Sequence, residues 1–210
     1  LISVLIIINA LIKPSFLFVF LPASFAFIFI YFKGNHRKKI NLALFPLFIG
    51  FCIIGLLYYF IFYLEWGAVY KGTSNIYISK PFNSVTQWIP YWYVPISFIV
   101  SFAFPIVVFC FYFKKITTYI PFVFALTLTM FGIIISTFIM EEGPRQFHGN
   151  FTWQNVICTY LLFLTSVTFL IPKIAAPKSK KLKVIMVIFG LHVLGGLIYI
   201  CKMYITSSYY

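Results

Sequence analysis

Ionisable side chains gather in the stretch 141–150, which reads Glu-Glu-Gly-Pro-Arg-Gln-Phe-His-Gly-Asn. It holds two of the three acidic residues of the chain and one of its three histidines. The Arg145 guanidinium can present paired N–H groups to a phosphate, and the His148 imidazole can carry a proton near neutral pH. We predict one substrate-binding cluster, beside an outer pocket that receives a lipid-linked phosphate, formed by Glu141, Glu142, Arg145 and His148.

The same stretch also has a purely structural interpretation. Gly143-Pro144 forces a turn, which leaves Glu141 and Glu142 at the end of one helix, where carboxylates are unfavourable unless a cation offsets the helix dipole. Arg145 would then pair with one of them, and Asn150 would cap the next helix. A glutamate and a histidine are too few ligands for a convincing metal site. No cofactor is evident, a divalent metal lacks support, and no catalytic residue is assigned.

A long connection, Glu65 to Tyr93, precedes this stretch and mixes aromatic with small polar residues. We expect Asn83 to Ile89 to form a short helix lying in the plane of the membrane interface. With Trp88 and Trp92 it would make a lid over an outward-facing cavity. The alternative is a loop that merely rests on the lipid surface.

The composition indicates the environment in which these loops are held. Hydrophobic residues make up 62% of the 210 residues and charged residues only 9%, with a mean hydropathy of +1.01. These values exclude a water-soluble globule and a disordered chain. The formal charge of +13 comes from 16 Lys and Arg against three Glu. In a membrane protein such an excess sets topology, so the sequence predicts membrane lipids as partners and no nucleic acid.

Apolar runs long enough to cross a bilayer predict an all-α polytopic helix bundle, organised as a single transmembrane domain over 1–210. A shorter run, Leu1 to Ile12, predicts a truncated first helix. We therefore expect the chain to be the C-terminal part of a longer protein, with the missing N-terminal segment as its partner. The six full spans are expected at Ser15 to Phe32, Ile40 to Leu64, Val94 to Phe113, Ile116 to Met140, Phe151 to Ile171 and Val184 to Ile205.

Lysines and arginines alternate between the connections and predict the orientation. Eleven of the 16 lie in the turns 33–39, 114–115 and 173–183, which we assign to the cytoplasmic side, whereas all three Glu and all four Trp lie on the other side. Pro105 is the expected kink. His192 is either functional or bonded to a neighbouring helix, and the glycines at 190, 195 and 196 predict close helix packing. The four cysteines show no CxxC spacing and predict neither disulfides nor zinc.

Two segments together resemble a known group of proteins. The stretch 13–23, Lys-Pro-Ser-Phe-Leu-Phe-Val-Phe-Leu-Pro-Ala, and the stretch 141–153, which ends in Phe-Thr-Trp, are similar to bacterial multi-pass proteins of the GT-C glycosyltransferase type. The resemblance implies action on polyprenyl-phosphate-linked sugars during assembly of cell-surface polysaccharide, in the bacterial inner (plasma) membrane. The essential acid of such enzymes lies in a first outer loop outside these residues. A flippase or transporter of lipid-linked saccharide, and a non-catalytic structural subunit, are the alternatives.

Overall fold

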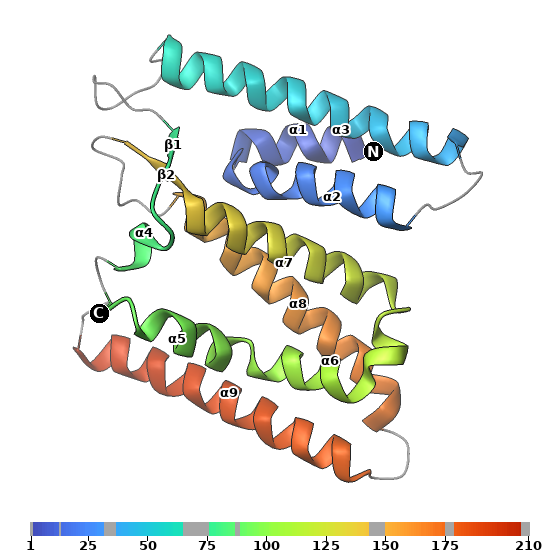
Figure 1. Cartoon of the computed structure of the whole chain (residues 1–210), viewed down its shortest axis with the longest axis vertical. Coiled ribbons are helices and arrows are strands. Elements are labelled where there is room, and N and C mark those ends of the chain that lie inside the picture. The colour runs from blue at the N-terminus through green and yellow to red at the C-terminus, as the bar shows by residue number, and fades with distance from the viewer. Residues whose placement is uncertain are drawn as a thin grey trace. The chain divides into compact units, whose positions relative to one another are not determined.

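The computed structural model describes residues 2–12, 14–31, 37–64, 76–86, 89–142, 150–174 and 179–206. Figure 1 labels the helices and strands along the chain. The chain divides into two compact units. The first unit comprises Leu1–Tyr91 and Phe124–Leu161, and the second comprises Trp92–Val123 and Leu162–Tyr210. Each unit is described by itself below.

Helices account for nearly all of the described chain, as the sequence predicts. The helices are α1 (Ile2–Ile12), α2 (Leu17–Tyr31), α3 (Arg37–Tyr58), α4 (Asn83–Thr86), α5 (Tyr93–Ser101), α6 (Ala103–Ile116), α7 (Ile120–Phe138), α8 (Asn150–Ile174) and α9 (Lys180–Thr206). A 3-10 turn, Pro14–Phe16, leads into α2, and a π-helical turn, Tyr59–Tyr63, ends α3. Within the described residues five helices are long and apolar enough to cross a membrane, or six when the bent pair α5 and α6 counts as one span. The chain is therefore an integral membrane protein.

The bend between α5 and α6 measures 59° and confirms that this span is kinked. The break lies at Phe102, whose φ of −98° and ψ of 6° leave the helical region, and not at Pro105 itself. Proline has no N–H, and its ring collides with the carbonyl of the residue four positions earlier, which here is Ser101. The proline therefore interrupts the helix upstream of its own position.

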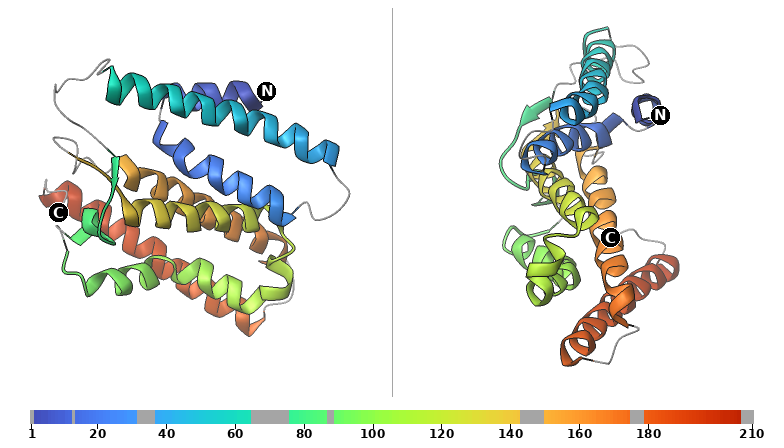
Figure 2. Two further views of the ribbon diagram at one scale, coloured as in Figure 1. Left: turned by 45° about the horizontal axis from the view of Figure 1, so that its top comes forward. Right: turned by 90° about the vertical axis from the view of Figure 1, so that its right-hand side faces the viewer.

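The first unit contains two apolar clusters. One joins α1, α2 and α3 through Ile6, Leu17, Leu21, Ile28 and Leu47. Gly50 permits the approach of α3, because a Cβ there would lie 2.6 Å from a methyl carbon of Leu21. Figure 2 shows α2 lying beside α3 in this unit.

The second cluster joins α2 to α7 and α8, through Val19, Ala23, Leu128, Ile135, Phe151 and Cys158. Gly132 allows α7 and α8 to cross closely, because a Cβ there would lie 3.2 Å from Asn155 Oδ1 and 3.4 Å from Cys158 Sγ. At the same crossing the Thr129 hydroxyl shares its proton between the carbonyls of Ala125 at 2.8 Å and Cys158 at 3.1 Å.

By contrast, the glycines predicted to pack closely do not do so within the described chain. Apart from their chain neighbours and the backbone of their own helix, no described heavy atom lies within 4 Å of a Cβ built at Gly190, Gly195 or Gly196. The three glycines lie in α9, and most side chains of this helix are exposed. The close approaches are made instead by Gly50 and Gly132 in the first unit.

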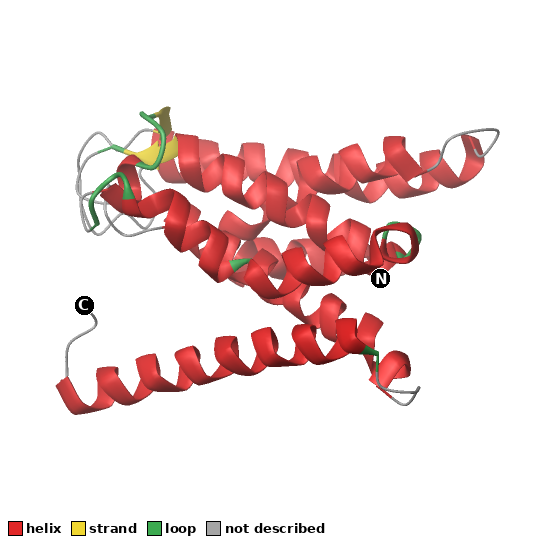
Figure 3. Ribbon diagram, turned by 60° about the horizontal axis from the view of Figure 1, so that its bottom comes forward, coloured by secondary structure: helices red, strands yellow, loops and turns green. Residues whose placement is uncertain are grey.

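A two-stranded ribbon is the only strand structure among the described residues. β1 (Ile76–Ile78) and β2 (Ile139–Glu141) pair antiparallel, with Ile76 opposite Glu141 and Ile78 opposite Ile139 (Figure 3). The span predicted to run to Met140 therefore ends as a helix at Phe138, and the expected helical position of Glu141 and Glu142 is wrong. The physical cause is tertiary: the Ser79 and Phe82 N–H groups donate to the last helical carbonyls, Phe138 O at 2.8 Å and Thr137 O at 3.0 Å.

The second unit has an aromatic interior. The Phe104 ring on α6 lies 5.5 Å from the ring of Phe163 on α8 and 4.9 Å from that of Phe189 on α9, measured between centroids. The His192 ring packs at 4.6 Å on the Phe163 ring. Histidine at this position thus extends an aromatic contact between α8 and α9.

Candidate functional site

The ribbon end of the first unit, defined by β1, β2, the segment 79–86 and the adjoining ends of α7 and α8, carries the described part of the predicted cluster. Glu141 is the last residue of β2 and is half-buried, while Glu142 directly after it is exposed. The Tyr77 hydroxyl donates across the ribbon to Met140 Sδ at 4.0 Å. The ribbon therefore holds the backbone of Glu141 in a fixed register.

Three predicted site residues lie outside the described residues: Arg145, His148 and Trp88. Trp92 is described, but it belongs to the second unit. Its side chain is exposed, and its ring stacks on that of Tyr93 at 3.8 Å. Of the predicted substrate-binding cluster, Glu141 and Glu142 are the members that the structure describes, and the cluster itself stays a prediction.

The helix expected from Asn83 to Ile89 is described as α4, Asn83–Thr86, while residues 87 and 88 lie outside the described residues. One further backbone bond joins Ile89 N to Val85 O at 3.2 Å. The position of α4 in the membrane interface stays a prediction. Phe82 precedes the turn with a φ of +58°, a left-handed conformation that is unusual for a bulky side chain. Its N–H bond to Thr137 O fixes this conformation, so α4 is joined to the end of α7.

The first unit also buries polar side chains among its apolar clusters, which we did not predict from the sequence. Six buried side-chain oxygens have no hydrogen-bond partner among the described residues. They are Asn9 Oδ1, Ser15 Oγ, Ser24 Oγ, Thr137 Oγ1, Gln154 Oε1 and Asn155 Oδ1. All six belong to the first unit. A buried oxygen without a donor costs about 1–3 kcal/mol, so each of these oxygens needs a donor from water, from a ligand or from residues outside the described ranges.

Gln154 is the clearest of these groups because its side chain is fully buried. Its Nε2 donates to the carbonyl of Phe151 at 2.6 Å, one turn earlier on α8. That bond fixes the amide and leaves Oε1 as an acceptor without a donor in the described chain. The amide is thus positioned to accept a hydrogen bond from a hydroxyl group or from water.

Most of these oxygens lie near the ribbon end. Thr137 is the second-last residue of α7, and Gln154 and Asn155 are within the first two turns of α8. Ser15 lies in the turn that opens α2, and Asn9 is one turn from the end of α1 that adjoins it (Figure 1). Ser24 is deeper along α2. The polar interior is therefore concentrated at the end of the unit that carries Glu141.

The sequence contained a signal for these buried polar side chains. Gln154 and Asn155 are adjacent amides inside an otherwise apolar span, and adjacent residues point to different faces of a helix. One of the two faces must then be turned toward the interior. We did not name either amide as a candidate site residue from the sequence.

No set of three His, Cys, Asp or Glu side chains that could hold a metal occurs within the described ranges. The four cysteines are unpaired, which confirms the expectation that they form no disulfide. Cys158 is buried against Gly132 at the crossing of α7 and α8 and acts as a small apolar group.

Searches of protein-family models, of curated proteins and of solved structures give no match to this chain.

Proposed function

We propose that this integral membrane protein binds a polyprenyl-phosphate-linked sugar at the ribbon end of the first unit. We further propose that it acts there as a GT-C-like glycosyltransferase in cell-surface polysaccharide assembly, in the bacterial inner (plasma) membrane. The observation that supports the proposal is the set of buried side-chain oxygens of the first unit, above all Gln154 Oε1, that have no donor among the described residues.

The chemistry of these oxygens favours the sugar as their ligand. The amide oxygens of Asn9, Gln154 and Asn155 only accept hydrogen bonds, whereas the three hydroxyls, of Ser15, Ser24 and Thr137, both accept and donate. Sugar hydroxyls can satisfy both kinds of group. A phosphate group at neutral pH presents acceptors and cannot satisfy an amide oxygen. The phosphate would instead contact Arg145, whose guanidinium supplies donors only. The proposal therefore separates two tasks: amide and hydroxyl oxygens bind the sugar, and Arg145 binds the phosphate.

The distribution of polar groups bears on the alternatives. A flippase needs polar contacts along the whole path through the bundle. In the described part of the first unit the unpartnered oxygens lie mostly at one end. A structural subunit needs no such oxygens at all, because each one lowers its stability. Binding and chemistry at the ribbon end account for the distribution better than transport or structure.

Binding measurements on the purified chain in nanodiscs test the two tasks separately. The probes are a polyprenyl phosphate that carries a sugar and the same polyprenyl phosphate without one. We expect Gln154→Leu to weaken binding of the sugar-bearing lipid about tenfold, the equivalent of one lost hydrogen bond of roughly 1.5 kcal/mol, and to leave the sugar-free lipid unaffected. Arg145→Ala should weaken both lipids about ten- to hundredfold, and Arg145→Lys should recover part of the loss.

Ser166→Ala is the matched control. Ser166 is also fully buried, but its hydroxyl donates to Leu162 O at 2.7 Å and it belongs to the second unit. Its removal should change neither affinity. The proposal fails if the wild-type chain binds neither lipid, or if Gln154→Leu and Ser166→Ala have the same effect on the sugar-bearing lipid.

A further inference from the structure

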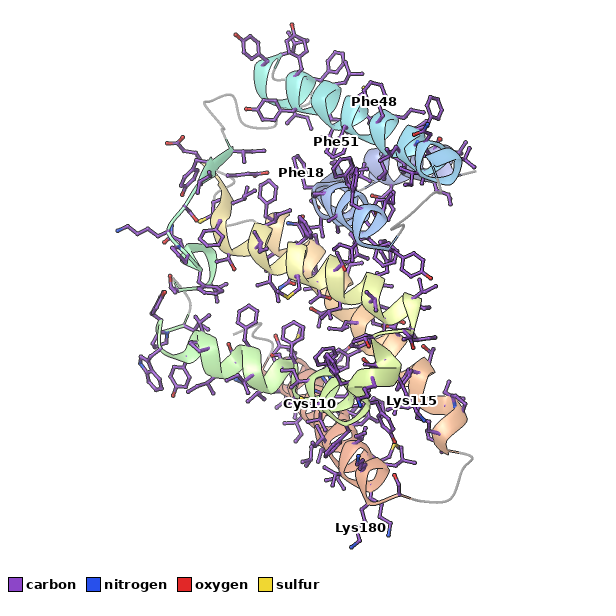
Figure 4. The ribbon with its side chains drawn as sticks, turned by 45° about the vertical axis from the view of Figure 1, so that its right-hand side comes forward. Phe18, Phe48, Phe51, Cys110, Lys115 and Lys180 are labelled. Carbon is purple, nitrogen blue, oxygen red and sulfur yellow. The ribbon has the colours of Figure 1, made fainter. Side chains whose placement is uncertain are left out.

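The second unit has an unbalanced charge. Its sequence contains no Asp or Glu and eight lysines. Seven of the eight lie in or beside the α6–α7 and α8–α9 connections: Lys114, Lys115, Lys173, Lys178, Lys180, Lys181 and Lys183. Figure 4 labels Lys115 and Lys180 at the same end of this unit. We call this end the lysine end. No carboxylate of the unit can neutralise it.

Lys173 is held in a defined position at this end. Its Nζ donates to Phe169 O at 2.8 Å and lies 3.4 Å from the centroid of the Phe169 ring and 5.5 Å from that of Tyr112. The ammonium is thus restrained by one carbonyl and two aromatic faces, and it keeps further N–H donors. Tyr112 precedes Lys115 by three residues on α6, so Lys173 lies beside the turn that carries Lys114 and Lys115. The contact brings positive charges from α6 and α8 to the same end of the unit.

The backbone of α6 changes direction at the same place. Tyr112 has non-helical dihedrals, φ −121° and ψ 22°, which reorient the last turn that carries Lys114 and Lys115. Beyond it, the Tyr119 and Thr168 hydroxyls are 3.3 Å apart. Because Thr168 donates its proton to Thr165 O, Tyr119 is the donor in this pair. These contacts tie the α6–α7 connection to α8.

The surroundings combine charge with exposed apolar surface. Phe113, Ile171 and Ile174 are each at least half exposed and lie within a few residues of Lys115 or Lys173. Lys173 itself belongs to a helix long and apolar enough to span the membrane. A soluble anion would use the lysines alone, whereas a lipid would also cover the apolar side chains. Basic pockets between membrane helices bind the head groups of anionic lipids.

We propose that the lysine end of the second unit binds the phosphate of an anionic phospholipid, with Lys115 and Lys173 as its main contacts. This site is independent of the sugar-lipid site in the first unit. Positive charge near an anionic membrane surface contributes about 1 kcal/mol per lysine, so the pair supplies roughly 25-fold in affinity.

Thermal unfolding of the purified full chain in neutral detergent tests the proposal. The probes are phosphatidylglycerol, phosphatidylcholine and inorganic phosphate at equal concentration. We expect phosphatidylglycerol alone to raise Tm, and the Lys115→Gln/Lys173→Gln variant to need roughly 25-fold more of this lipid for the same shift. Lys80→Gln, which removes an exposed lysine of the first unit, is the charge control and should respond as the wild type does.

Each remaining outcome decides the proposal. An equal shift with inorganic phosphate indicates a small-anion site and overturns lipid binding, as does an equal shift with phosphatidylcholine. If the double Gln variant fails to fold, Lys115→Arg/Lys173→Arg keeps both charges and should retain the shift. Loss of the shift in that variant, or an undiminished response in the double Gln variant, refutes the site.

Discussion

The two units differ most in what they bury. Of the residues the structure describes, the first unit buries seven polar side chains: Ser15, Ser24, Ser79, Thr129, Ser136, Thr137 and Gln154. The second buries only Ser166, whose hydroxyl is satisfied within its own helix. The acidic residues of the chain all lie in the first unit, and half of its Lys and Arg lie in the second.

The contrast suits ligand binding in the first unit and contact with the bilayer in the second. An unsatisfied oxygen inside a membrane protein lowers stability, so its presence favours a ligand that satisfies it. Aromatic packing with lysines at one end does not need such a ligand, and it suits a unit that contacts lipid tails and head groups. We therefore expect substitutions in the first unit to affect ligand binding, and those in the second to affect the response to lipid.

The largest expected effect concerns the side of the membrane on which each connection lies. If the basic turns set topology, cysteines introduced at Lys38 and Lys114 in a cysteine-free background should label only from the cytoplasmic side. A cysteine introduced at Lys80 should label only from the other side. Accessibility to a membrane-impermeant maleimide in intact and opened cells measures this all-or-none difference. Labelling of the Lys38 and Arg145 positions from the same side would show that the topology is wrong.

Glycine substitutions in the two units should change the free energy of unfolding by different amounts. Gly132→Leu places a side chain against Asn155 and Cys158 at the crossing of α7 and α8, and should lower the free energy of unfolding by about 3 kcal/mol. Gly195→Leu meets open space in α9 and replaces the weakest helix former but proline, so stability should stay level or rise slightly. Denaturant titration in mixed micelles measures both, and equal losses would remove the distinction.

A smaller effect is expected from single hydroxyl groups. Thr129→Val removes a bond that links α7 to α8 at 3.1 Å and should cost about 1 kcal/mol of unfolding free energy. Ser166→Ala removes a bond within one helix and should cost less than roughly 0.5 kcal/mol. The same titration compares the two. A larger loss for Ser166→Ala would contradict the interpretation of the α7–α8 crossing.

The helical spans could be predicted from sequence because hydropathy and length decide them. Bilayer thickness requires long apolar runs, and only helices satisfy their backbone groups within one segment. The kink near Pro105 followed from the chemistry of proline. These features depend on local residues, so one sequence is enough to find them.

Features that depend on distant partners could not be predicted in the same way. α7 ends at Phe138 because Ser79 and Phe82 bind its last carbonyls, and neither residue is near it in sequence. The buried polar side chains were missed because one amide such as Gln154 barely changes the mean hydropathy of a long span. Phosphate binding by Arg145 and His148 stays a prediction, as does the lid formed by Trp88 and Trp92.

The pairing of β1 with β2 also has a consequence during synthesis of the chain. Ile78 pairs with Ile139, about sixty residues later in the chain. At about 5–20 residues per second, β1 leaves the ribosome roughly 3–12 s before its partner strand is made. During that interval its edge is open to pairing with other chains. Slower translation of the segment 79–138 should therefore increase misassembly at this edge, whereas the helices made earlier would be unaffected.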